Sequence, residues 1–149
     1  MLWIIIISFI FLEYFIVTGG KMYDELMAAL YEKAAAGVEI RMMVDEMGSL
    51  STLPKDFYQS CAAHQIKSIP YNPLSPSLFK FISFRDHRKM TIVDGRVAIT
   101  GGINIGDEYI NEKVRFGHWK DMALRLEGEA VFSLTTMFIN MWDYSTGTV

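Results

Sequence analysis

Two short β-forming runs that are separated by only two residues constrain the fold of this chain more than any other feature. The runs are residues 89–93 and 96–100, and Asp94 and Gly95 stand between them. Asp-Gly is among the strongest signals for a type I′ turn, in which both central residues have a positive φ. We therefore predict a β-hairpin in which Asp94 and Gly95 are structural turn residues. Its predicted pairs are Val93 with Arg96, Thr91 with Ala98, Lys89 with Thr100, and His87 with Gly102.

The hairpin brings polar side chains that suit phosphate chemistry to one place. Side chains alternate along a strand, so His87 and Lys89 point to one face, near Gly102, and Asn104 follows just beyond. An ammonium and a carboxamide donate hydrogen bonds to charge that develops on a phosphoryl oxygen. A histidine can attack phosphorus or protonate a leaving alkoxide. Asp94 lies about 23 Å further along an extended strand, too far to act as a catalytic acid there.

The rest of the chain alternates between strand and helix patterns. Strands are predicted at residues 8–17, 38–44 and 66–71, helices at 21–36, 54–65 and 129–142, a turn at 45–48 and a loop at 71–77. This alternation favours an α/β fold in which helices flank a sheet. A length of 149 residues fits a single domain over residues 1–149. Residues 1–7 are expected to be at most the remnant of an upstream element.

Composition and charge narrow the possible partners and cofactors. The formal net charge is −3, which disfavours a general electrostatic grip on nucleic acid, so nucleic acid is an unlikely partner. The single cysteine, Cys61, excludes a disulfide within the chain, and the motif region has no metal-ligand spacing. We therefore expect no metal and no other cofactor. Residues 1–17 are nearly all apolar, but Glu13 interrupts them before the length of about twenty that a membrane span needs. We interpret this run as a buried strand and keep a membrane anchor as the alternative.

The motif region resembles a known superfamily. His87, Lys89, Asp94, Gly101-Gly102 and Asn104 follow the spacing HxKx4Dx6GGxN, which resembles the HKD motif of the phospholipase D superfamily. Five segments resemble more specifically the first catalytic half of bacterial cardiolipin synthases. They are FLEYFIV at 11–17, GVEIRMMVDEMGS at 37–49, RDHRKMTIVDG at 85–95, TGGINIGDEYI at 100–110 and FGHWKDMALRLEGEAV at 116–131.

This resemblance implies a fold, a reaction and a set of site residues. The fold is a phospholipase D-like sandwich, a mixed β-sheet flanked by helices, of which this chain is one HKD half-domain. The reaction is phosphatidyl transfer between two molecules of phosphatidylglycerol, an anionic phospholipid, through a phosphohistidine and without a metal. His87 matches the motif histidine, and Lys89, Gly102 and Asn104 match the phosphate-binding positions. Asp121 matches a carboxylate that orients the imidazole.

The chain departs from the resemblance in ways that leave alternatives open. It carries one motif where the full-length enzymes carry two, and it lacks the two upstream membrane helices. A second HKD domain is therefore expected, either from a second copy or from a C-terminal half, and the domain is expected to associate with the cytoplasmic side of the cell membrane. One alternative is a homodimeric single-motif nuclease or phosphodiesterase, although such members typically read GSxN where this chain has Gly101-Gly102-x-Asn104. The other is a truncated half-domain without catalytic activity.

Overall fold

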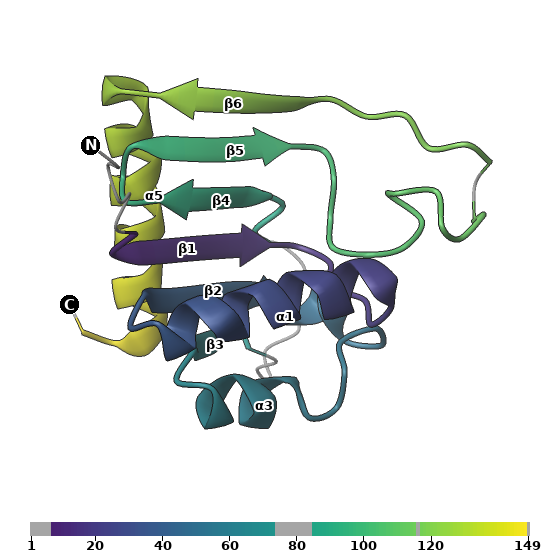
Figure 1. Cartoon of the computed structure of the whole chain (residues 1–149), viewed down its shortest axis with the longest axis horizontal. Coiled ribbons are helices and arrows are strands. Elements are labelled where there is room, and N and C mark those ends of the chain that lie inside the picture. Colours follow the sequence, from purple (N-terminus) through teal and green to yellow (C-terminus); the bar gives the residue numbers. More distant parts are fainter. Residues whose placement is uncertain (1–6, 74–84, 116, 149) are drawn as a thin grey trace, which may run out of the picture.

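A six-stranded mixed β-sheet forms the centre of the computed structural model, which describes residues 7–73, 85–115 and 117–148 (Figure 1). The strands are β1 (Phe9–Tyr14), β2 (Glu39–Asp45), β3 (Lys67–Tyr71), β4 (Met90–Val93), β5 (Val97–Gly101) and β6 (Ala123–Glu127). They follow the order β3-β2-β1-β4-β5-β6 across the sheet. The β1–β3 half is parallel, and every pairing from β1 through β4 and β5 to β6 is antiparallel.

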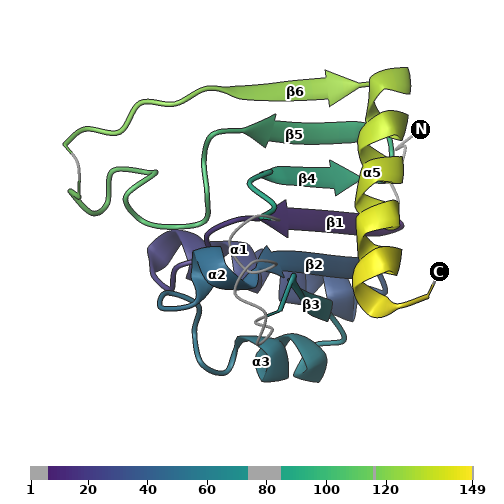
Figure 2. The same ribbon diagram turned by 180° about the vertical axis from the view of Figure 1, so that it is seen from behind.

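Helices flank both faces of the sheet, as the fold class predicted. α1 (Lys21–Ala35) and α3 (Phe57–Ala63) lie over the β1–β3 half of one face (Figure 1). α5 (Glu129–Thr146) crosses the opposite face, close to the end at which β1 begins (Figure 2). α2 (Glu46–Ser49) is a single turn directly after β2. The β4–β6 half of the first face therefore has no helix over it among the described residues.

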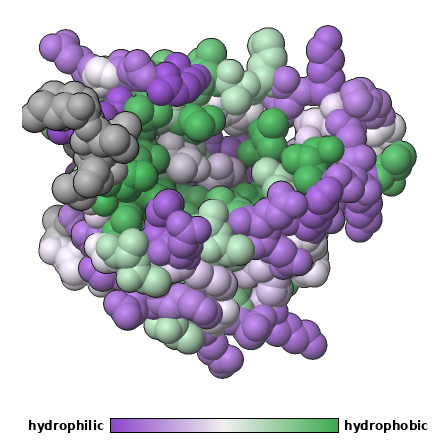
Figure 3. All heavy atoms as spheres, in the orientation of Figure 1, coloured by the Kyte–Doolittle hydropathy of each residue, from purple (hydrophilic) through white to green (hydrophobic). Residues whose placement is uncertain are grey.

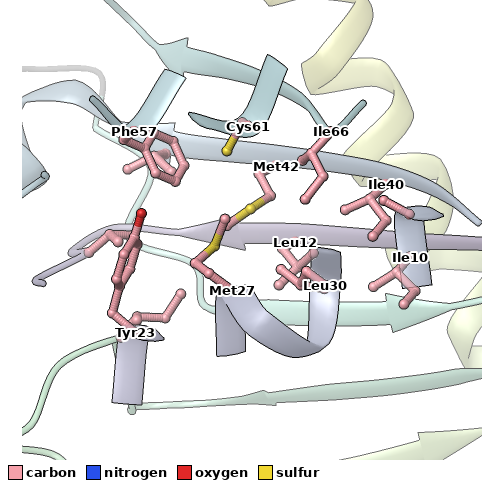
Figure 4. Packing of buried hydrophobic residues seen from close by; sticks show 14 of the residues in the cluster. Ile10, Leu12, Tyr23, Met27, Leu30, Ile40, Met42, Phe57, Cys61 and Ile66 are labelled. Carbon is pink, nitrogen blue, oxygen red and sulfur yellow. The ribbon is translucent and has the colours of Figure 1, made fainter. Parts of the chain in front are cut away.

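The alternation of side chains along the strands builds two separate cores. Leu12 on β1 and Met42 on β2 pack against α1 and α3, in the cluster drawn in Figure 4. Phe11 and Met43, one position away on the same strands, pack beneath α5 with Phe138. Each fully buried side chain of this size contributes about 1.5–3 kcal/mol to stability. Several such side chains together hold the helices on each face against the sheet.

The structure corrects the predicted hairpin register by one residue. The observed pairs are Met90 with Thr100, Thr91 with Ile99, Ile92 with Ala98 and Val93 with Val97. The Asp-Gly turn does form, with a φ of 53° at Asp94 and 63° at Gly95. Arg96, however, belongs to the turn: its N–H donates a hydrogen bond to the Val93 carbonyl at 3.0 Å, and Val97 is the first residue of β5 to pair with β4. Burial explains the shift: the observed register places Ala98 beside Ile92 beneath α5, whereas the predicted one turns it to the other face.

The other predicted elements agree in type with the structure and differ mainly at their ends. The first strand is shorter than predicted, and Val17 makes only an isolated bridge to Ile105. The predicted turn at 45–48 contains α2, since the Asp45 carboxylate accepts a hydrogen bond from Gly48 N and caps this helical turn. β6 was not predicted. Residues 1–6 of the expected remnant and residues 74–77 of the expected loop lie outside the described residues.

Within the described part of the chain, no helix combines the length and the apolar character that crossing a bilayer demands.

Candidate phosphoryl-transfer site

The candidate site lies at one end of the sheet. β1 and β5 end there, and β4 and β6 begin there, at the right of Figure 1. Residues that follow β1, precede β4, follow β5 and precede β6 are therefore neighbours in space although they are far apart in sequence. Figure 3 shows the same view as spheres, with a hollow near the middle of the face turned to the viewer, bordered by hydrophobic residues.

His87 and Lys89 meet at the ring of Phe15, which directly follows β1. The exposed imidazole of His87 lies 4.5 Å from the Phe15 ring, measured between centroids, and the Lys89 Nζ lies 5.1 Å from the centre of the same ring. Lys89 Nζ also donates a hydrogen bond to the backbone carbonyl of His87. The predicted association of these two side chains is therefore observed, and Phe15 is the residue that sequence analysis missed.

Lys89 is a buried amine that uses only part of its hydrogen-bonding capacity among the described residues. Its side chain is 5% exposed, and burial lowers the pKa of its ammonium, while Asp86, Asp121 and Asp45 act in the opposite direction. An ammonium has three N–H donors, and the His87 carbonyl takes one of them. A pocket of about 180 Å³ adjoins Lys89, and its lining is mainly apolar: Tyr14, Met22, Ile99, Thr100, Gly101, Ile103 and Ala123. Among the described residues the other donors have no acceptor, and a phosphoryl oxygen would provide one.

Asn104 is buried and fixes the backbone next to Phe15. Its Oδ1 accepts a hydrogen bond from Ile16 N at 2.9 Å, and its Nδ2 donates to the hydroxyl of Tyr109 at 3.0 Å. No hydrogen bond joins its carboxamide to His87 or Lys89. The structure thus places Asn104 at the predicted end of the sheet, with its side chain engaged in holding the segment that carries Phe15.

Gly102 and Asp121 pack directly against each other where β5 ends and β6 begins. A Cβ on Gly102 would lie 2.5 Å from Asp121 Oδ1, so any other residue at this position would displace the carboxylate. The Asp121 carboxylate accepts hydrogen bonds from Trp119 Nε1 at 3.1 Å and from Met122 N at 2.7 Å. No hydrogen bond joins Asp121 to His87, so the orienting contact that the sequence suggested is not made in this structure.

Asp94 lies at the opposite end of β4 from His87. Its Oδ1 accepts hydrogen bonds from the backbone N–H groups of Ser8 at 2.7 Å and Phe9 at 2.9 Å, where β1 begins. With Gly95 it forms the turn and ties the hairpin to the central strand of the sheet. This agrees with the structural role expected for these two residues.

Sequence analysis also missed the buried charges on either side of His87. Asp86 and Arg88 alternate with His87 and Lys89, and their side chains form an ion pair with an Nη2–Oδ2 distance of 2.9 Å. Arg88 also contacts Glu13 on β1. Side chains alternate along an extended chain, which predicted a shared face for His87 and Lys89. The same alternation places Asp86 and Arg88 together on the opposite face. Among the described residues, no group of three or more His, Cys, Asp or Glu side chains is arranged to hold a metal ion.

A solved structure of similar fold identifies the fold class. Nuc from Salmonella typhimurium, a phospholipase D family member, matches this structure with a TM-score of 0.66. The match covers 91% of this chain and 78% of Nuc at 17% sequence identity, which shows a likeness of fold alone. The fold is therefore that of the phospholipase D-like α/β proteins.

Sequence comparison identifies the family within this class. Residues 4–142 match the family described as "Cardiolipin synthase, PLD-like domain". The chain is 40% identical over 139 residues to a cardiolipin synthase of Geobacillus kaustophilus, covering 93% of this chain and 28% of that protein. It is 48% identical over 136 residues to a Streptococcus mutans protein, covering 91% of this chain and 30% of that protein. The chain belongs to the cardiolipin synthase, phospholipase D-like domain family, and it spans less than a third of the length of these relatives.

Proposed function

We propose that this domain supplies one half of a phosphatidyltransferase site that makes cardiolipin from phosphatidylglycerol. The observation that carries the proposal is that an exposed imidazole, His87, and a buried amine, Lys89, contact the same aromatic ring, Phe15. Family membership supports the same reaction class. The apolar pocket beside Lys89 favours a lipid phosphodiester over a nucleic acid, and the net charge of −3 agrees with this preference.

The chemistry proceeds in two steps. An imidazole nitrogen of His87 attacks phosphorus, a P–N bond forms, and the P–O bond to glycerol breaks. The leaving oxygen takes a proton from the histidine of a second HKD domain, because His87 cannot be nucleophile and acid in one step. The hydroxyl of a second phosphatidylglycerol then attacks phosphorus and returns a proton to that histidine while the P–N bond breaks. Lys89 neutralises charge on the phosphoryl oxygens throughout.

The remaining site residues support this chemistry indirectly. Asn104 holds the segment of Phe15, and Gly102 leaves room for the Asp121 carboxylate, which stands at the same end of the sheet as His87. The partners are an anionic membrane surface on the cytoplasmic side and a second HKD domain, provided by another copy of the chain or by a further segment of a longer protein.

The test uses the full chain with two kinds of substrate and a matched histidine control. Phosphatidylglycerol vesicles and plasmid DNA are each incubated with the wild type, His87→Ala and His64→Ala. His64 stacks on Tyr31 with a centroid distance of 3.7 Å and lies outside the site, so its loss tests for a general effect of removing a histidine. We expect cardiolipin and glycerol in equal amounts from the wild type and His64→Ala, and neither from His87→Ala. Lys89→Gln is expected to lower the rate about 100-fold.

Three outcomes would overturn the proposal. Nicked plasmid without cardiolipin identifies a nuclease. Cardiolipin formation that survives His87→Ala removes this residue from the reaction. A lack of any reaction from a chain that sediments as a dimer also overturns the proposal, because both halves of the site are then present, whereas an inactive monomer is a half-domain that is not catalytic by itself.

A further inference from the structure

A cluster of buried charges lies directly behind His87, and the chemistry proposed above does not use it. Glu13, Asp45 and Asp86 are 1%, 1% and 7% exposed, and Arg88 contacts two of them. Burying ionisable groups costs several kcal/mol each unless they are paired and hydrogen-bonded. Burying three acidic side chains beside one short segment therefore costs free energy. The hydrogen bonds and ion pairs of these side chains indicate their role.

The first contact joins Asp86 to Arg88, the residues on either side of His87, and we call this pair the clamp. Asp86 Oδ1 accepts hydrogen bonds from the backbone N–H of Arg88 at 3.0 Å and from Arg88 Nε at 2.9 Å, and Asp86 Oδ2 accepts one from Arg88 Nη2 at 2.9 Å. The residue before the histidine is thereby joined to the residue after it, through both the backbone and the side chain. On the opposite side, Lys89 Nζ holds the carbonyl of His87.

The second contact anchors this clamp to the end of β2. Asp45 Oδ2 accepts a hydrogen bond from the backbone N–H of Asp86 at 3.1 Å, and Asp45 Oδ1 pairs with Arg85 Nη1 at 3.3 Å. The same carboxylate caps α2 through Gly48 N at 2.9 Å. One side chain thus joins β2, α2 and the segment that leads into His87.

The third contact anchors the clamp to β1. Glu13 pairs in register with Met90 on β4 and Met43 on β2, so it stands in the middle of the sheet, and its Oε1 lies 2.7 Å from Arg88 Nε. Burial, followed by a hydrogen bond to Asp86 and the charge of Asp86, raises the pKa of Glu13 to about 9. Hydrogen bonds from Arg88 lower the pKa of Asp86. A neutral Glu13, an ionised Asp86 and the Arg88 cation therefore leave this part of the cluster without net charge at neutral pH.

The ring of His87 has fewer contacts than the backbone around it. Its backbone is held on both sides, whereas its exposed ring touches Phe15 and makes no hydrogen bond to a described residue. We propose that Glu13, Asp45 and Asp86 are positioning residues, which fix the backbone around His87 so that its imidazole meets phosphorus in a single orientation. This inference rests on the proposed role of His87 as nucleophile. Misplacing a reacting group by about 1 Å can cost about 100-fold in rate, so such a clamp has a measurable effect.

The test compares variants of the full chain with a matched control. Asp86→Asn keeps the shape of the clamp but removes the charge that Arg88 binds. Glu13→Gln replaces a neutral group by a neutral one, whereas Glu13→Ala removes it. Glu39→Gln is the control, because Glu39 pairs with Arg41 and Lys67 at the opposite end of β2. The readouts are kcat and KM on phosphatidylglycerol vesicles, urea stability, and the NMR signals of the His87 ring, assigned with His87→Ala among the three histidines.

We expect Asp86→Asn and Glu13→Ala to lower kcat about 10- to 100-fold with KM within about twofold, and to split or broaden the His87 ring signals. Glu13→Gln and Glu39→Gln are expected to retain the wild-type kcat and ring signals. If Asp86→Asn does not fold, Arg88→Lys serves in its place, since it keeps the charge but loses the planar fork that binds Asp86.

The outcomes separate this inference from the proposed function. Activity that survives His87→Ala contradicts the proposed function. Activity that depends on His87 but is unchanged in Asp86→Asn and Glu13→Ala contradicts the positioning role alone. If the wild-type chain turns over no lipid, the NMR signals decide: ring signals identical in wild type, Asp86→Asn and Glu13→Ala overturn the positioning role, and altered signals in both variants support it.

Discussion

Glu13 should make the stability of this domain fall as the pH rises across the neutral range. Its pKa is raised from 4.5 to about 9 in the folded chain, mainly because burial disfavours the carboxylate, with a hydrogen bond to Asp86 and the charge of Asp86 adding to the effect. In the unfolded chain the group ionises near 4.5. Between these two values the native state holds a proton that the unfolded state has released. The contribution is therefore complete below pH 4.5 and is lost as the pH rises towards 9.

The magnitude follows from proton linkage. One proton released on unfolding lowers the free energy of unfolding by about 1.4 kcal/mol per pH unit, so Glu13 accounts for about 2.7 kcal/mol between pH 6 and pH 8. Glu13→Gln removes this titration and keeps a hydrogen-bond donor towards Asp86. The stability of Glu13→Gln relative to the wild type should therefore rise by about 1.4 kcal/mol per pH unit over this range.

The assay is urea unfolding of both proteins at pH 6, 7 and 8, followed by circular dichroism. All other ionisable groups are common to both proteins, so their contributions cancel in the difference. Two stability curves that run parallel from pH 6 to pH 8 would show that Glu13 is ionised in the folded chain, and the argument for a neutral Glu13 would fail.

Three further predictions concern packing and the turn. Gly102→Ala places a Cβ 2.5 Å from Asp121 Oδ1 and should cost about 1–3 kcal/mol in urea unfolding, and an unchanged midpoint would exclude this contact. Asp94→Ala removes the acceptor for two N–H groups at the start of β1 and should cost about 1–2 kcal/mol without changing kcat, whereas a lost kcat at full stability would make Asp94 a site residue. Phe138→Ala empties a fully buried position beneath α5 and should cost about 3–5 kcal/mol by calorimetry, and a cost below about 1 kcal/mol would contradict the packing described.

Local patterns were sufficient to predict the turn and the shared face of the motif. Asp94 and Gly95 have the positive φ values that their types favour, because this preference belongs to the residues themselves. His87 and Lys89 both contact the ring of Phe15, in agreement with the shared face that the two-residue period of an extended chain predicts.

The hairpin register could not be predicted in the same way. It depends on which face of β5 lies beneath α5, and the residues of the hairpin carry no information on where a helix that begins at Glu129 will pack. The same Asp-Gly turn can be followed by either register: Arg96 pairs with Val93 in the predicted one and belongs to the turn in the observed one. Burial of Ala98 decides between them, and this is a tertiary contact.

The residues that surround the site were missed because their contacts are also tertiary. Glu13 lies within the strand that was predicted to be buried, but the sequence did not indicate its partner. In the structure this partner is Arg88, from a segment far away in sequence. Similarly, the hydrogen bond between Asn104 and Tyr109 depends on the course of the loop after β5, which no periodicity encodes.

The described chain starts beside the beginning of β1 and finishes after α5, and both places lie at the end of the sheet remote from His87 (Figure 1). A biotin tag or a fluorophore attached after Thr148 would therefore leave the end of the sheet that carries His87 unobstructed. Immobilised in this way on a sensor surface, the domain would present that end to vesicles supplied from solution, so that lipid capture could be recorded independently of turnover.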